Sequence, residues 1–273
     1  MNGALSIRNA GKVYDPRGAA VEALRECSLD IPGGDFVAVV GPSGCGKSTL
    51  LNAIAGFDRL TAGEIRMDGE LLTGPRSMTP PGPDRVVVFQ HGALFPWRTV
   101  LENVVYGPLR QRRLARDEAE RKALQLLRAS GGLDAVAAAY PGQLSSGMQR
   151  RVEILRALMN EPRVLLLDEP FRAMDTVSKT TMHGHLLDLY ALSPRTILFI
   201  THDLDEAIYL ADTVVVMTTR PGTIKQTAAV GLERPRLPAM RQSQRYLALK
   251  RDIAGSVHEE AMKAFERGER EQA

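Results

Sequence analysis

The stretch that most constrains this chain is GPSGCGKS, residues 41–48, which follows the apolar run DFVAVV and leads into a helical pattern. An uninterrupted apolar run predicts a strand that is buried on both faces, as in a parallel sheet. The glycines let backbone N–H groups approach an anion, and the start of the next helix adds positive potential. The spacing G-x-x-x-x-G-K-[ST] after a buried strand therefore predicts a phosphate-binding loop in an α/β fold.

The side chains of this loop have separate expected roles. Lys47 supplies a positive charge to the phosphates of a nucleotide, and Ser48 supplies a hydroxyl ligand to Mg²⁺. Cys45 occupies a free position, where a small filler is favoured over a redox role. A glycine-rich turn with a purely structural purpose does not explain the lysine. The expected nucleotide contacts are Gly41, Pro42, Ser43, Gly44, Cys45, Gly46, Lys47, Ser48 and Thr49.

The order of strand and helix patterns predicts an α/β fold with an insertion. Two alternating runs, LSIRNAGKVY and LRECSLDIP, predict antiparallel strands near the start. Buried-strand patterns return at RVVVFQ, VLLLD, TILFITH and TVVVM, with helical patterns between them. Strand patterns are missing between Gln90 and about Asn160. We expect one domain over residues 1–233, with a core at about 1–90 and 161–233, a helical lobe at about 91–160, and a helical tail at 234–273.

Composition narrows the class of protein. With 273 residues, 44% of them hydrophobic, the chain can bury a sizeable core. A net charge of +3 is too small to argue for nucleic acid as the main partner. Cys27 and Cys45 fit neither a disulfide framework nor a zinc site, and a reducing cytosol suits them best. No apolar run approaches the roughly 20 residues that span a bilayer, so we expect at most a peripheral subunit docked on a membrane partner.

A second buried strand pattern is followed directly by two acidic residues. Residues 164–170 read VLLLDEP, and open α/β sheets bind ligands at the carboxyl ends of their strands. Asp168 is expected to join the Mg²⁺ shell, and Glu169 to polarise the attacking water. Adjacent acidic residues after a strand are by themselves typical of a solvated turn or a helix cap. In a chain that also has the phosphate loop, the catalytic interpretation is favoured.

Two further polar residues end predicted strands. His202 follows TILFIT, where an imidazole can bond the γ-phosphate and orient the water. Gln90 ends RVVVFQ, where its amide can reach the metal or the water, and an ordinary loop amide is the alternative. By contrast, His183 and His185 are two apart on a predicted helix and so lie on different faces. We expect these two to be solvated rather than metal ligands.

An aromatic residue and a basic tail complete the candidates. Tyr14 ends the first predicted strand and could stack on adenine, with a packed tyrosine near a hairpin as the alternative. After RPRLP, the tail predicts a helix with Leu249, Ile253, Val257 and Phe265 near one face. The basic side chains of the tail could contact lipid headgroups or regulate a dimer, but a solvated helix face is the favoured interpretation. These cations are Arg234, Arg236, Arg241, Arg245, Lys250 and Arg251.

Taken together, these motifs resemble the nucleotide-binding subunits of ATP-binding cassette (ABC) transporters, from about Leu5 to Lys225. GPSGCGKST resembles the Walker A motif, Gln90 the Q-loop, LSSGMQ the cassette signature, VLLLDEP the Walker B motif, AMD at residues 173–175 the D-loop, and His202 the switch histidine. The resemblance implies a P-loop NTPase core of the RecA-like type with an antiparallel N-terminal part and an inserted helical lobe.

The same resemblance implies a composite site between two subunits. In that family, two subunits face head to tail, and the signature of one closes on the ATP held by the other. Ser145 and Gly147 would then contact the nucleotide of the partner, and Asp175 of the D-loop is a further expected nucleotide-binding residue. The signature segment LSSGMQRR has no phosphate-binding lysine of its own, which fits half of a shared site.

The segment VFQHGALFPWRTVLENVVYGP resembles the importer branch for nitrate, taurine, aliphatic sulfonates and related solutes. This implies permease subunits, a second ABC subunit, a periplasmic or lipid-anchored solute-binding protein, and a place at the cytoplasmic face of the bacterial inner membrane. Phe95, Pro96 and Trp97 would help to form the groove that receives a short permease helix. Packing of Trp97 inside its own lobe is the alternative.

The sequence departs from the family pattern at two positions, and it leaves two other functions open. Ser146 stands where the family usually has glycine, and FRAMD places Arg172 where F-G-A-L-D is usual. Both affect the expected hydrolysis rate, and a heterodimer with one weakened site is one possible outcome. The alternatives are a soluble cassette ATPase of DNA repair or translation and, less favoured, a P-loop small-molecule kinase. The kinase would use an arginine lid, for which Arg110, Arg112, Arg113 and Arg116 are available, although a solvated face explains them too.

Overall fold

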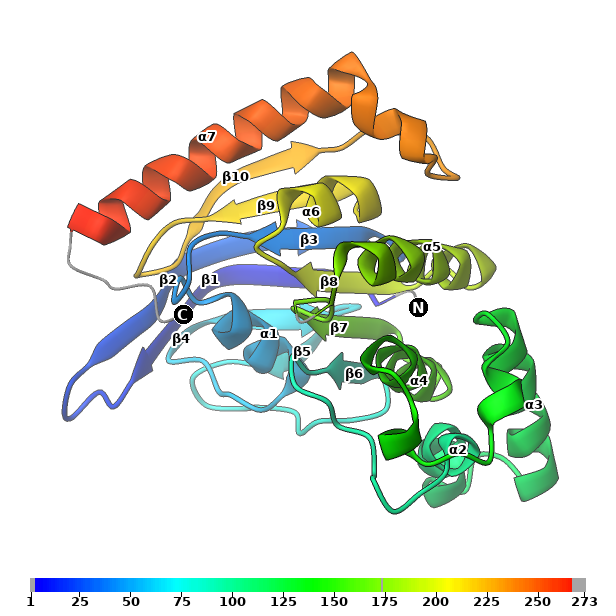
Figure 1. Ribbon diagram of the computed structural model, residues 1–273. Coiled ribbons are helices and arrows are strands. Elements are labelled where there is room, and N and C mark those ends of the chain that lie inside the picture. The colour runs from blue at the N-terminus through cyan, green and yellow to red at the C-terminus, as the bar shows by residue number, and fades with distance from the viewer. Residues whose placement is uncertain (1–2, 173, 267–273) are drawn as a thin grey trace. The chain divides into compact units, whose positions relative to one another are not determined.

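The protein is described by a computed structural model (Figure 1), which covers residues 3–172 and 174–266. The chain divides into two compact units. The first contains residues 1–82 and 194–273, and the second contains residues 83–193. No helix in the described part of the chain is long and apolar enough to span a bilayer.

The first unit contains strands of two kinds. An antiparallel sheet has the order β2-β1-β4-β5 and is formed by β1 (Leu5–Tyr14), β2 (Val21–Ile31), β4 (Ala62–Met67) and β5 (Glu70–Thr73). The second group has β3 (Phe36–Val40) between β8 (Thr196–Ile200) and β9 (Thr213–Met217), both parallel to it, with β10 (Ile224–Ala229) antiparallel to β9. Every residue of β3 is buried, as its uninterrupted apolar run predicts.

The helices of the first unit come after its strands β3, β8 and β10 along the chain. They are α1 (Lys47–Ala55), α6 (Leu204–Leu210), the short 3-10 helix η3 (Pro238–Gln242) and α7 (Gln244–Glu266). Helix α1 ends at Gly56, which has a left-handed backbone, and α6 is capped by the Asp203 side chain. Helix α7 packs against α6, β9 and β10, and Figure 1 shows it running along β10.

The second unit is mainly helical. Its two strands, β6 (Arg85–Val88) and β7 (Val164–Asp168), are parallel. Its helices are α2 (Val100–Arg110), α3 (Arg116–Ala129), η1 (Leu133–Val136), η2 (Pro141–Gln143), α4 (Ser146–Leu158) and α5 (Thr176–Leu192). Helix α2 packs against α3 and α4 and starts with a capping box formed by Thr99 and Glu102. The predicted fold class, α/β with an antiparallel N-terminal part and a helical insertion, is confirmed, while the domain boundaries stay a prediction.

Two expectations about individual side chains are wrong. Phe265 is 78% exposed, and the buried face of α7 consists of Tyr246, Ile253, Glu260 and Ala264. His183 is buried, with its ring 5.3 Å from that of Phe171.

The basic tail is also less solvated than expected. Arg236 is buried and donates to the carbonyl oxygens of Leu232 and Ala211. Arg234 forms an ion pair with Asp212 at 2.8 Å. Cations of the tail therefore hold it to the rest of its unit.

Candidate active site

The phosphate loop lies between β3 and α1 and has the backbone that its glycines allow. Gly44 and Gly46 have φ values of 74° and 95°, and a Cβ on Gly46 would lie 2.7 Å from the carbonyl oxygen of Ala23. Lys47 Nζ donates to the carbonyl oxygens of Gly41 and Pro42, at 2.8 Å each, and the residue is only 7% exposed. The lysine charge is therefore held at the centre of the loop.

The start of α1 suits an anion. Within residues 3–172 and 174–266, no side chain caps this helix terminus, because its N-cap is Gly46. Uncapped N–H groups and the helix dipole together favour negative charge. Ser48 lies in the first turn and is exposed, whereas Cys45 is buried and its thiol pKa is raised, mainly by burial. These features fit a phosphate group above the loop.

Tyr14 lies beside the same helix. Its hydroxyl donates to Asp58 Oδ2 at 2.7 Å and lies 3.4 Å from Thr49 Oγ1. Lys12 Nζ is 4.7 Å from the centroid of the Tyr14 ring. Burial is the main cause that raises the pKa of Tyr14; the bond to Thr49 lowers this pKa and the bond to Asp58 raises it, and the net direction is upward, so the phenol stays a neutral donor.

His202 leaves the sheet at the same edge as the phosphate loop. Strands β3 and β8 are parallel neighbours, with Val39 opposite Ile200. The chain after each strand therefore starts from one edge of the sheet. His202 is exposed there, between the end of β8 and the start of α6. Within the first unit, the structure thus places Tyr14 beside Thr49 of α1, and places the phosphate loop and His202 at one edge of the sheet.

The acidic pair belongs to the second unit. Asp168 is the last residue of β7, and Glu169 follows it with a φ of 43°, a left-handed conformation that is strained for a residue with a Cβ. Glu169 Oε2 accepts from Arg172 Nη1 at 3.2 Å. Arg172, one of the two residues that depart from the family pattern, therefore contacts the candidate catalytic carboxylate.

The signature segment opens α4, as its composition predicts. Ser145 is the N-cap of this helix, and its hydroxyl accepts from the backbone N–H of Met148 at 3.3 Å. A Cβ on Gly147 would lie 3.3 Å from Met174 Cε. Asp175 caps α5 by accepting from the N–H groups of Val177 and Ser178 at 3.0 Å each. The remaining D-loop residue predicted from the sequence, Ala173, lies outside the described residues.

A charged pair that the sequence did not point to joins the Gln90 segment to α4. Arg150 donates to the carbonyl oxygens of Phe89 and Gln90, each at 2.6 Å, and to Glu153 at 2.7 Å. Glu153 Oε1 accepts from the N–H of Ala93 at 2.6 Å. Opposite charges three apart on a helix are a weak indication of such a role, because most of them are solvated. Here both side chains are largely buried, and they fix the chain on both sides of Gln90.

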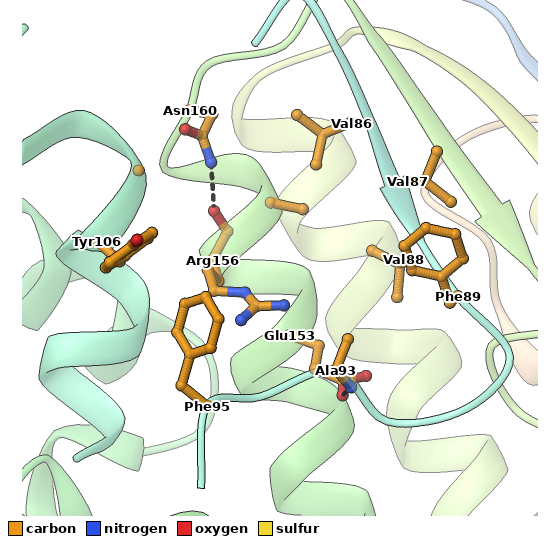
Figure 2. Close-up of a pocket in the computed structure, with 12 residues that line it drawn as sticks. Val86, Val87, Val88, Phe89, Ala93, Phe95, Tyr106, Glu153, Arg156 and Asn160 are labelled. Carbon is orange, nitrogen blue, oxygen red and sulfur yellow. Dashed lines mark hydrogen bonds between the residues drawn. The ribbon is translucent and has the colours of Figure 1, made fainter. Parts of the chain in front are cut away.

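A hollow of about 220 Å³ lies beside this pair in the second unit (Figure 2). The Phe95 ring lies 4.8 Å from the Tyr106 ring and 5.1 Å from the Arg156 guanidinium. Trp97 packs against Phe95, with the two ring centroids 5.6 Å apart, and is 70% exposed. The full lining is Val86, Val87, Val88, Phe89, Ala93, Phe95, Tyr106, Gly107, Glu153, Arg156, Ala157 and Asn160.

Comparisons with known proteins agree with these features. The family model described as "ABC transporter" matches residues 24–172. An uncharacterized ABC transporter ATP-binding protein of Methanocaldococcus jannaschii is 41% identical over 96% of this chain and 94% of its own. The nitrate import ATP-binding protein of Synechocystis is 43% identical over 84% of this chain and 83% of its own. The taurine import ATP-binding protein of Rhizobium johnstonii is 44% identical over 81% of each chain.

A solved structure is similar as well. A dimeric ATP-binding cassette in a post-hydrolysis state with ADP and Pi superposes with a TM-score of 0.70 at 28% identity, covering 84% of this chain and all of the other. The phosphate loop, the acidic pair after a buried strand and these matches lead to one conclusion. The chain belongs to the ABC transporter family, as an ATP-binding protein with ATPase activity.

Proposed function

We propose that this protein is the ATP-hydrolysing subunit of an importer for a small solute such as nitrate, taurine or an aliphatic sulfonate. Relatives named for nitrate and taurine import support the importer branch. The observation that carries the proposal is the hollow in the second unit, because its wall residue Glu153 also bonds the segment after Gln90. A partner seated there would contact residues that hold a candidate catalytic side chain.

The chemistry follows from the site residues. Lys47 and the loop N–H groups bind the phosphates of ATP, and Tyr14 stacks on the adenine. Water attacks the γ-phosphorus, the bond to the bridging oxygen breaks, ADP leaves, and Glu169 accepts the proton of the water. Gln90 and His202 orient the water and the γ-phosphate. The hydroxyl of Ser48 and the carboxylate of Asp168 are oxygen donors that suit Mg²⁺, and Gln90 adds an amide oxygen. When bound, the ion would neutralise the phosphate charge.

Two copies of the cassette are proposed to close on two ATP molecules. Ser145, Gly147 and Asp175 would contact the nucleotide held by the facing subunit, an arrangement that a two-fold axis repeats. The dimeric ATP-binding cassette among the solved structures supports this arrangement. If this subunit works in a heterodimer with one weakened site, the purified protein alone should not form an ATP-bound dimer with two equivalent sites.

We propose that a short cytoplasmic helix of a permease occupies the hollow. Phe95 and Tyr106 line the hollow, and the exposed Trp97 packs on Phe95, so the three rings provide apolar contact area of the kind that dominates binding interfaces. The wall of the hollow also includes Glu153, whose pair with Arg150 bonds both sides of Gln90 and lies on the signature helix. Movement of the permease segment would therefore reach Gln90 and α4 together. The subunit would sit at the cytoplasmic face of the membrane, with a solute-binding protein on the other side.

Trp97→Ser tests the docking surface. Because Trp97 is exposed, the change should leave the fold and the basal ATP turnover of the isolated subunit intact. Loss of an aromatic anchor should weaken permease binding about 30-fold. The measurement is the amount of permease retained by tagged subunit from solubilised membranes. Leu192→Ser is a matched control, since Leu192 is 71% exposed and lies at the end of α5, whereas Trp97 packs on Phe95 in the wall of the hollow. Equal permease recovery by both variants would contradict the assignment of the hollow.

Arg172→Met tests the departure from the family pattern. The Arg172 guanidinium donates to Oε2 of Glu169, and this bond would compete with the attacking water for the carboxylate. An ion pair this exposed contributes up to about 1 kcal/mol, so freeing the carboxylate should raise kcat by about fivefold at most. KM for ATP should stay unchanged. Steady-state phosphate release across an ATP series measures both, and a lower kcat would mean that Arg172 assists hydrolysis.

The experiment for the function as a whole is affinity capture of the tagged protein from gently solubilised host membranes, with partners identified by mass spectrometry. A polytopic permease is the expected partner, and its associated binding protein would identify the solute. Recovery of soluble partners alone, with the protein absent from membranes, would favour a cassette ATPase outside transport.

A further inference from the structure

The segment that carries His202 is fixed by bonds on both sides of the histidine. Thr201 Oγ1 donates to the buried Glu206 at 2.6 Å, and the N–H of Asp203 donates to Thr201 Oγ1 at 3.0 Å. The Asp203 carboxylate accepts from the N–H groups of Asp205 and Glu206, at 2.9 and 3.2 Å. The backbone around His202 is therefore tied to the first turn of α6, and a shift of that turn would move the imidazole.

Helix α7 holds the same turn from outside. Tyr246 Oη donates to Asp205 Oδ1 at 2.8 Å, and Lys250 Nζ donates to Asp205 Oδ2 at 2.7 Å. Tyr246 is 1% exposed, so its hydroxyl acts in a buried setting. Burial raises the pKa of Asp205, but the bonds from Lys250 and Tyr246 outweigh it, and the net pKa lies below the usual value. Both oxygens of a charged carboxylate are thus engaged by one helix.

The far end of α7 has a separate attachment. Lys225 of β10 pairs with Glu259 at 2.6 Å and with Glu260 at 2.9 Å. Glu260 also accepts from the N–H of Thr219 at 3.0 Å. These bonds involve the chain around β9 and β10 and not the first turn of α6. The helix therefore has two attachments of similar chemistry, of which the Asp205 attachment is the one that reaches the His202 segment.

We propose that Asp205, Tyr246 and Lys250 form a clamp through which the C-terminal helix positions His202 for ATP hydrolysis. The proposal rests on the proposed role of His202 at the γ-phosphate. The three residues are positioning residues, because they act through the first turn of α6 and do not touch the nucleotide. A docked α7 then favours turnover, and release of its first turns lowers it. On this proposal, the C-terminal helix contributes to the rate of ATP hydrolysis.

The test compares the two attachments in the full-length protein. Tyr246→Phe removes one hydroxyl and keeps the buried ring, and Lys250→Met removes the ammonium. Because small misplacement of a reacting group lowers rates steeply, the double variant should lose about tenfold in kcat, with KM for ATP within about twofold. Lys250→Arg should retain most of the activity. Lys225→Met, which breaks the far attachment, should leave kcat unchanged.

A double-mutant cycle with His202→Ala separates positioning from stability. In that background, Tyr246→Phe with Lys250→Met should cause no further loss of kcat. If His202→Ala itself leaves turnover unchanged, the proposed role of His202 fails, and the clamp fails with it. If His202→Ala lowers turnover but the clamp variants do not, the clamp alone is overturned. Equal losses from Lys225→Met and from the clamp variants would also overturn it, since α7 would then act through stability. Thermal melting, with Tyr246→Phe alone as the milder change, identifies variants that unfold.

Discussion

Glu169→Gln is expected to preserve ATP binding and to lower ATP turnover by about 100-fold or more, which is the usual contribution of a general base to the rate. The amide keeps the shape of the side chain and suits the left-handed backbone at this position no worse than the carboxylate does. It cannot accept the proton of the attacking water, so an ATP-bound state should accumulate. Phosphate release measures the turnover, and calorimetric titration with ATP measures the binding.

Two other variants make this result specific. Glu161→Gln removes a carboxylate of the same unit that forms an exposed ion pair with Arg113, and it should leave turnover unchanged. Glu169→Gln also removes the ion pair with Arg172, so Arg172→Met serves as the control that keeps the carboxylate. Phosphate release at the rate of the unmodified protein in Glu169→Gln would remove this residue from its role.

The parts of the fold that were predictable depend on local patterns. The apolar run of β3 and the glycine spacing of the phosphate loop are contiguous in sequence, and both elements form as expected. The signature segment begins with Ser145, a residue type that favours N-caps, and it caps α4. Such patterns need no knowledge of distant residues.

The parts that were missed depend on distant partners. Tyr246 and Glu260 are polar, so apolar periodicity does not place them on the buried face of α7. They are buried because Asp205 and Lys225, 41 and 35 positions earlier, bond them. His183 is buried because its ring meets Phe171. A neighbour outside its own helix decides the burial of each of these side chains.

The Arg150–Glu153 pair was missed for a related reason. Its partners are backbone atoms of Phe89, Gln90 and Ala93, and no side-chain pattern reveals bonds to the main chain. The sequence identified the motif residue Gln90, but it did not identify the charged pair that holds the segment around Gln90. The sequence thus identifies candidate chemical groups better than it identifies the residues that orient them.

Lys47→Ala is expected to weaken ATP binding itself, by about 10- to 100-fold, the effect of losing a hydrogen bond to a charged group. The structure adds a second reason, because the Lys47 ammonium also bonds the carbonyl oxygens of Gly41 and Pro42. Without it, those carbonyl groups lose their donor, and the loop is less well ordered before the nucleotide arrives. Calorimetric titration with ATP measures the loss.

Lys47→Arg separates charge from shape at this position. Lys47 is almost fully buried and bonds two carbonyl oxygens through one ammonium group, a geometry that the wider planar guanidinium should not reproduce. Arginine should therefore restore little affinity, although it keeps the positive charge. Lys122→Ala is the matched control, because Lys122 pairs with Glu118 on the exposed side of α3. Unchanged ATP affinity in Lys47→Ala would contradict the phosphate-binding role, whereas full recovery with arginine would show that charge alone, and not the fit of the ammonium within the loop, determines the affinity.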